Sequence, residues 1–86
     1  MPEISRFLGI VIKMYFKDHN PPHFHVIYGK HKAAIDINNL NIITGKLPPR
    51  ILALVVEWAS IHKKELLKNW NKLKDFHNPN KIDPLV

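Results

Sequence analysis

The hydrophobic pattern of this chain changes its period at Leu47-Pro48-Pro49, and this change constrains the fold more than any other feature. Before this point apolar residues alternate with polar ones, which is typical of half-buried strands. After it, apolar residues recur at helical spacing, and proline is tolerated in the first turn of a helix. We therefore predict one long helix that starts at Pro48-Pro49 and ends at about Asp75. The residues on its buried side are Ile51, Leu54, Val55, Trp58, Ala59, His62, Leu66, Asn69 and Leu73.

The part of the chain before Leu47, where apolar and polar residues alternate, predicts a small antiparallel β-meander of about four to five strands. Turn-forming residues separate apolar runs at 10–16, 23–29, 32–37 and 42–44. The long C-terminal helix is expected to pack across one face of this sheet, so the predicted fold class is α+β. A chain of 86 residues has room for one core, and residues 1–86 are expected to form a single domain. The apolar tail, residues 81–86, is expected to dock back onto it.

The central hairpin is predicted from its two apolar sets, which must lie on the same face of the sheet. Phe24, Val26 and Tyr28 form one set, and Ala33, Ile35 and Ile37 form the other. A two-residue loop at Lys30-His31 meets this condition, whereas a slip by one residue would mix the two faces. This register predicts that His25 lies opposite Asp36, and that His23, His25 and Asp36 share the other face.

Motifs along nearly the whole chain resemble one known family. They are Pro2 to Phe7, Gly9-Ile10, Asp18 to Val26, Tyr28-Gly29, Asp36, Leu47-Pro48-Pro49, Glu57-Trp58, His62, Asn69-Trp70 and Ile82 to Leu85. In these the chain is similar to the domain-of-unknown-function 4160 family. The resemblance implies a small stand-alone protein encoded beside another small protein, as in a toxin–antitoxin pair. It implies no activity.

Three histidines and an aspartate are concentrated around Pro21-Pro22, and they predict a functional site. Two imidazoles can act as general base and general acid in one turnover, because their pKa lies near neutral pH. Cleavage of RNA without a metal ion needs such a pair and a cation for the phosphate. In this hypothesis the protein is a metal-independent endoribonuclease. Its candidate catalytic residues are His23, His25, Asp36, His19 and Asp18, with positive charge from Lys13, Lys17 or Lys32.

The same residues admit a metal site and a purely structural role. His19, His23 and His25 beside a carboxylate supply the nitrogen and oxygen ligands that zinc, iron or nickel accept. A divalent metal is therefore a possible cofactor, although the endoribonuclease hypothesis requires none. Alternatively, Asp18 and Asn20 cap the Pro-Pro turn through bonds to the backbone, and the histidines have no chemical role.

The charge of the chain indicates a polyanionic partner. The formal net charge is +6, and eleven of the thirteen basic residues are lysines. RNA or another polyanion is the expected partner, and the alternative to an enzyme is a non-enzymatic nucleic-acid-binding or regulatory module. Lysines toward a helix C-terminus also complement its dipole, which explains their position without a ligand. The candidate nucleic-acid-binding residues are Lys17, Lys32, Lys64, Lys68 and Lys72.

The remaining expectations concern location and assembly. The sequence contains no cysteine, which fits a reducing compartment, and no apolar run approaches the length of a membrane span. We therefore expect a cytoplasmic protein without a membrane partner. An exposed edge strand and the apolar tail favour a homodimer or a small antitoxin-like protein partner. The sequence has no phosphate-binding glycine loop, nucleophile elbow or dinucleotide fingerprint.

Overall fold

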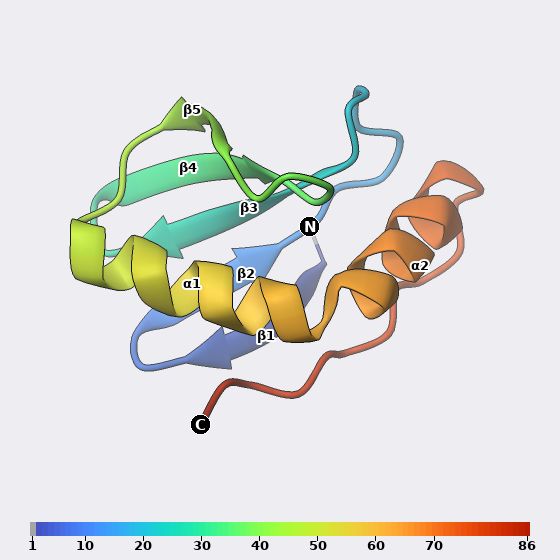
Figure 1. The fold of residues 1–86 in the computed structure, drawn as a ribbon. Coiled ribbons are helices and arrows are strands. Elements are labelled where there is room, and N and C mark those ends of the chain that lie inside the picture. The colour runs from blue at the N-terminus through green and yellow to red at the C-terminus, as the bar shows by residue number, and fades with distance from the viewer. Residues whose placement is uncertain (1) are drawn as a thin grey trace.

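The computed structural model describes residues 2–86 and shows an α+β fold built on an antiparallel meander (Figure 1). Within these residues five strands form one sheet in the order of the sequence, and two helices follow. This confirms the predicted fold class. The elements are β1 (Glu3–Phe7), β2 (Ile10–Lys13), β3 (His23–Tyr28), β4 (His31–Asp36), β5 (Ile42–Gly45), α1 (Pro49–Ile61) and α2 (Lys63–Lys74).

The first two strands differ from the prediction. β1 was not expected as a strand, and it pairs with β2 across a turn at Leu8-Gly9. The run predicted as a strand over residues 10–16 leaves the sheet after Lys13. Residues 14–22 instead form the connection to β3, and this connection carries Asp18.

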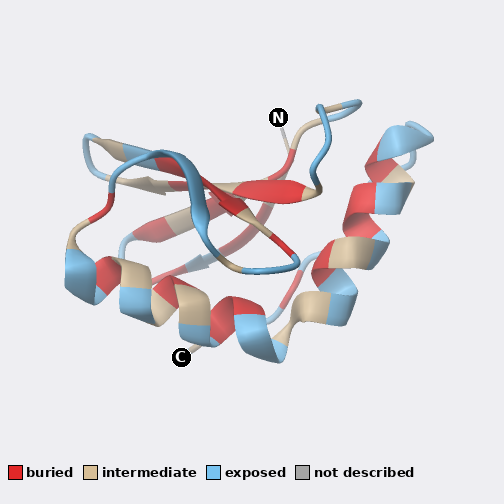
Figure 2. Ribbon diagram, turned by 45° about the horizontal axis from the view of Figure 1, so that its top comes forward, coloured by how far each residue is buried: buried red, intermediate tan, exposed pale blue. Residues whose placement is uncertain are grey.

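The core lies between one face of the sheet and the helices (Figure 2). Trp58 of α1 is fully buried, with its ring centroid 5.7 Å from that of Phe7 and 6.0 Å from that of Phe24. Each large apolar side chain buried in this way stabilises the fold by about 1.5–3 kcal/mol. The sheet therefore has one face committed to the core, and the histidines of β3 point to the opposite face.

The prediction of one long helix is wrong, because the helix divides at His62. His62 adopts φ −109° and ψ 22°, and its Nδ1 lies against the carboxylate of Glu65 in the first turn of α2. Figure 2 shows α2 at an angle to α1. Trp70, a buried residue of α2, packs against His23 at the start of β3. The apolar spacing continues through the break, so periodicity could not reveal it. Neither helix within residues 2–86 has the length and apolar character needed to cross a membrane.

The central hairpin keeps the predicted faces but not the predicted register. The two-residue loop is Gly29-Lys30, because Tyr28 pairs with His31. Gly29 has φ +58°, a left-handed conformation that glycine adopts without steric cost. His25 consequently lies opposite Ala34, and Asp36 lies opposite His23, so the predicted pairing of His25 with Asp36 is wrong. The shift is two residues, which preserves the alternation of faces.

The C-terminal tail docks back onto the domain, as predicted. The N–H of Ile82 donates to the carbonyl of Ile4 at 2.8 Å, and the indole N–H of Trp58 donates to the carbonyl of Asp83 at 2.8 Å. The buried side-chain amide of Asn69 makes two hydrogen bonds with the backbone of Asn80. Its Nδ2 donates to the Asn80 carbonyl at 2.9 Å, and its Oδ1 accepts from the Asn80 N–H at 2.8 Å.

Replacing Asn69 by alanine tests how far the tail stabilises the fold. Asn69→Ala leaves a backbone donor and acceptor of Asn80 without their partners, which is expected to lower the free energy of unfolding by about 1–3 kcal/mol. Lys72→Ala is the matched control, because Lys72 makes only a solvent-exposed bond to the Asn80 side chain. Urea unfolding measures both variants. Equal, small effects of the two substitutions would contradict this account.

Candidate functional site

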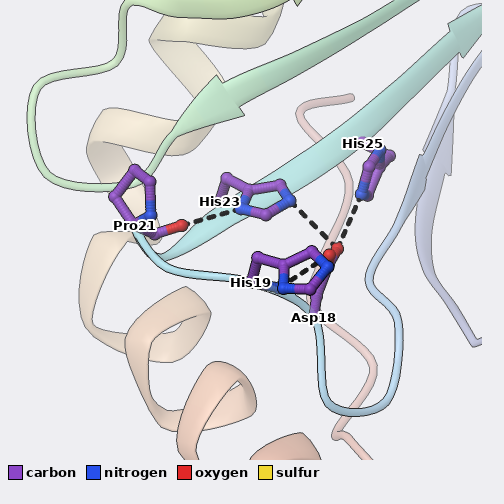
Figure 3. A network of polar contacts seen from close by, with 5 residues as sticks. All are labelled: Asp18, His19, Pro21, His23 and His25. Carbon is purple, nitrogen blue, oxygen red and sulfur yellow. Dashed lines mark hydrogen bonds and ion pairs between the residues drawn. The ribbon is translucent and has the colours of Figure 1, made fainter.

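Asp18 stands on the connection between β2 and β3, and its carboxylate lies against the side chains of His23 and His25 on β3. The backbone N–H of His19 donates to Asp18 Oδ1 at 2.9 Å and so fixes the carboxylate (Figure 3). The second oxygen, Oδ2, faces the histidines of β3. The carboxylate is therefore held by its own loop and presents one oxygen to the sheet.

His23 and His25 meet at this oxygen. They stand two residues apart on β3, so both side chains point to the same face. The Nε2 atom of each ring lies 2.9 Å from Asp18 Oδ2. Of the three side chains, that of His23 is 10% exposed, Asp18 18% and His25 27%. The site is thus partly buried and open to solvent on the His25 side.

Neighbouring groups fix the two imidazoles. His23 Nδ1 lies 2.7 Å from the carbonyl oxygen of Pro21, and a carbonyl only accepts, so Nδ1 carries a hydrogen. The ring of Trp70 in α2 packs against His23, with centroids 5.3 Å apart. Tyr15 packs edge-on against His25 at 4.4 Å. These contacts leave each Nε2 directed at Asp18.

Burial and the histidines act on Asp18 in opposite directions. Its burial alone raises the pKa of the carboxyl group. The hydrogen bond from His25, that from the His19 backbone and the charges of both imidazoles act the other way and prevail. The pKa of Asp18 is therefore below its usual value, and the group is a carboxylate at neutral pH.

The structure brings together some of the predicted catalytic residues and separates others. Asp18, His23 and His25 form one cluster, in which a ligand atom from each lies within 4.8 Å of the other two. His19 contributes its backbone N–H, and its own side chain lies outside this cluster. Asp36 caps the following turn, where its Oδ1 accepts from the N–H groups of Asn38 at 2.7 Å and Asn39 at 3.1 Å. The predicted role of Asp36 in orienting His25 is therefore not supported.

The five candidate lysines are dispersed over the molecule. Lys17 lies over the ring of Phe76, with its Nζ 5.1 Å from the centroid. Lys64 and Lys68 are exposed on α2, and Lys72 donates to the side chain of Asn80. Lys32 lies on β4, on the same face as His25. Of the five, Lys32 lines the same pocket as His25.

Sequence reasoning missed the groups that orient the histidines. The Pro21 carbonyl carries no sequence signal, because any residue supplies a carbonyl. The contact of Trp70 depends on the helix break, which the periodicity concealed. Tyr15 could have been found, since strand alternation places it on the same face as Lys13, which pairs with His25.

The tautomer of His23 is a direct test of this geometry. Long-range ¹H–¹⁵N NMR spectra, recorded with chelator present, are expected to show a protonated Nδ1 at His23 because of the bond to Pro21. Exposed His77 is the internal control, and its two tautomers are expected to exchange. A bare Nδ1 at His23 would contradict the assignment.

The comparisons with known proteins place the chain in a family. A family model described as Domain of unknown function (DUF4160) matches residues 9–71, which contain the Asp18 loop, strands β2 to β5, α1 and most of α2. Comparisons with curated proteins and with solved structures gave no match. The family match covers well over half of the chain and agrees with the motifs at Asp18 to Val26. The protein therefore belongs to the DUF4160 family.

Proposed function

We propose that Asp18, His23 and His25 bind one divalent transition-metal ion, and that this ion is the reactive centre of a hydrolase acting on RNA. The observation that carries the proposal is the convergence of two imidazole nitrogens and one carboxylate oxygen within 4.8 Å. Two histidines and a carboxylate form a common ligand set of hydrolytic zinc sites and of non-haem iron sites. Three protein ligands leave a coordination position for water, as catalytic zinc sites do.

The distances suit an ion after a small movement. Ligand atoms at about 2.0–2.2 Å from zinc lie about 3.3 Å apart in a tetrahedral site. The two Nε2 atoms are each 2.9 Å from Asp18 Oδ2, so the carboxylate has to withdraw by a few tenths of an ångström. Asp18 stands on a loop, where such a shift disturbs no strand pairing.

The bond from His23 to Pro21 is also the arrangement that a metal ligand needs. Metal-binding histidines usually donate their second N–H to a carbonyl or carboxylate, which fixes the tautomer and the ring orientation. With a hydrogen on Nδ1, the neutral ring of His23 presents the lone pair of Nε2 toward Asp18 Oδ2. Two electron-rich atoms at 2.9 Å require a proton or a cation between them. A metal ion meets this requirement for both histidines at once.

A bound ion would supply the chemistry that hydrolysis of a phosphodiester needs. Such an ion would polarise a phosphoryl oxygen and would lower the pKa of a bound water to about 7. The net charge of +6 favours a polyanionic substrate, and we propose RNA. A cytoplasmic toxin–antitoxin setting belongs to this proposal as the context in which such a protein would meet RNA.

Metal-independent acid–base cleavage is the second candidate. The observation that favours it is the hydrogen bond between His25 Nε2 and Asp18 Oδ2 at 2.9 Å, since a carboxylate can orient a catalytic imidazole. Against it, the two imidazoles converge on one carboxylate rather than standing on either side of a space for phosphate. The carboxylate would also repel the phosphate. The metal-dependent proposal therefore accounts for more of the geometry.

Metal binding is tested by calorimetric titration of chelator-treated protein with Zn²⁺. One ion per chain is expected. Asp18→Asn, His23→Ala and His25→Ala are each expected to weaken the affinity by more than about 100-fold, because even the loss of an outer-shell partner costs 10–100-fold. His77→Ala is the matched control and should bind as the wild type does. Two results would contradict the proposal: wild-type protein that binds no Zn²⁺, or Asp18, His23 and His25 variants that bind it as well as the wild type does.

Cleavage of labelled single-stranded RNA distinguishes the two candidate reactions. The metal-dependent reaction should stop with chelator and return when Zn²⁺ or Mn²⁺ is added in excess. Activity that survives chelator and is lost in His25→Ala would instead establish the acid–base reaction.

A further inference from the structure

A pocket lies on the face of the sheet that the helices leave uncovered, directly beside His25. Its volume is about 350 Å³, which is within the range of small-ligand sites. It is lined by Lys13, Tyr15, His25, Lys32, Thr44 and Gly45, together with the apolar residues Val26 and Ile27 of β3 and Ala33 and Ala34 of β4. His25 therefore belongs both to this pocket and to the cluster with Asp18 and His23.

The register of the sheet forms the pocket. Lys13, His25, Ala34 and Thr44 are successive partners across β2, β3, β4 and β5, so they form one row on one face. Ala34 has the smallest of the four side chains, and this leaves a hollow beside His25. The pocket is thus a feature of the strand pairing and not of a loose loop.

The edge strand closes the hollow because Gly45 permits a close approach to β4. A Cβ atom at this position would lie 2.1 Å from the carbonyl oxygen of Lys32, and Gly45 has φ +85°. Only glycine fits both conditions without a shift of the backbone. The closeness of β5 to β4 keeps Thr44 in the row opposite Ala34.

The lining is positively charged and offers hydrogen-bond donors. The lining residues include two lysines, Lys13 and Lys32, two residues with hydroxyl groups, Tyr15 and Thr44, and no aspartate or glutamate. Within residues 2–86 neither lysine has a carboxylate at ion-pair distance, and Glu3, which pairs with Lys13 in the sheet, is held by Arg6 at 2.8 Å. The charge of Lys13 acts on the Glu3 carboxylate, but neither Lys13 nor Lys32 forms an ion pair within the described residues. Two such lysines beside residues that carry hydroxyl groups suit an anion with several oxygens.

We propose that this pocket binds a phosphodiester group of single-stranded RNA between Lys13 and Lys32. The inference rests on the proposed function and names the subsite that holds its substrate. Because the ring of His25 forms part of the wall, a phosphate in the pocket lies next to the cluster of Asp18, His23 and His25. The lysines neutralise the phosphate, and the adjoining centre acts on it.

The pocket is tested by fluorescence anisotropy with a labelled ten-nucleotide single-stranded RNA, in chelator so that no metal-dependent cleavage occurs. The double variant Lys13→Ala/Lys32→Ala is expected to bind at least 10-fold more weakly. Its plot of log affinity against log salt should be shallower by about 1, because one phosphate contact is lost. The matched control is Arg50→Ala/Lys74→Ala, which removes the same charge from exposed positions on the two helices and should change the affinity less than about two-fold.

A third variant tests the shape of the pocket without changing its charge. Ala34→Leu fills the hollow and leaves every charge in place, so it should also weaken RNA binding by about 10-fold, with circular dichroism confirming the fold. Wild-type affinity in Ala34→Leu, or an equal loss in the Arg50→Ala/Lys74→Ala control, would overturn the proposal. A DNA strand of the same sequence that binds as tightly as the RNA would overturn the assignment to RNA.

The metal proposal and the pocket proposal fail separately. Neither lysine belongs to the metal cluster, so the Lys13→Ala/Lys32→Ala variant should retain wild-type affinity for Zn²⁺. If the protein binds no Zn²⁺ but the pocket variants lose RNA affinity, the pocket proposal stands and the metal proposal is rejected. If the protein binds Zn²⁺ normally and the pocket variants keep their RNA affinity, the metal proposal stands and the pocket proposal is rejected.

Discussion

One carboxylate oxygen, Asp18 Oδ2, lies 2.9 Å from the Nε2 atoms of both His23 and His25, and the arrangement of the site depends on this shared contact. Strand alternation alone aims the two imidazoles in the same direction, but it leaves them without a common partner. The loop between β2 and β3 supplies that partner, and the His19 backbone holds the other carboxylate oxygen. The Asp18 carboxylate, partly buried between two imidazole rings, requires a cation or a shared proton to be stable.

The rest of the fold keeps this group in place while leaving one side of it open. One face of the sheet packs on Trp58 and the other apolar residues of the core, which fixes β3. The break at His62 lets α2 reach the end of the sheet, where Trp70 packs on His23. The opposite face remains uncovered around His25, so a ligand can approach from that side. The separation of a packed face from a polar face thus links the stability of the domain to the chemistry it can perform.

The sequence predicted those features that follow from periodicity and composition. Alternation placed His23 and His25 on one face, and the run from Asp18 to His25 located the cluster. The register was missed by two residues, because that shift preserves the alternation and only the φ of Gly29 selects the turn. The break at His62 was missed because the apolar spacing continues through it. Local patterns therefore predicted the face of the sheet on which each side chain lies. The pairing of particular side chains depended on backbone conformations that the patterns do not encode.

The most direct measurement is an anomalous difference map at the zinc absorption edge from crystals grown with Zn²⁺ after chelator treatment. The account predicts one strong peak, about 2.0–2.2 Å from Asp18 Oδ2 and from Nε2 of His23 and His25, with at least one further ligand from solvent. A map without a peak at this position, or with zinc held only at half-buried His31 or exposed His77, would contradict the central claim.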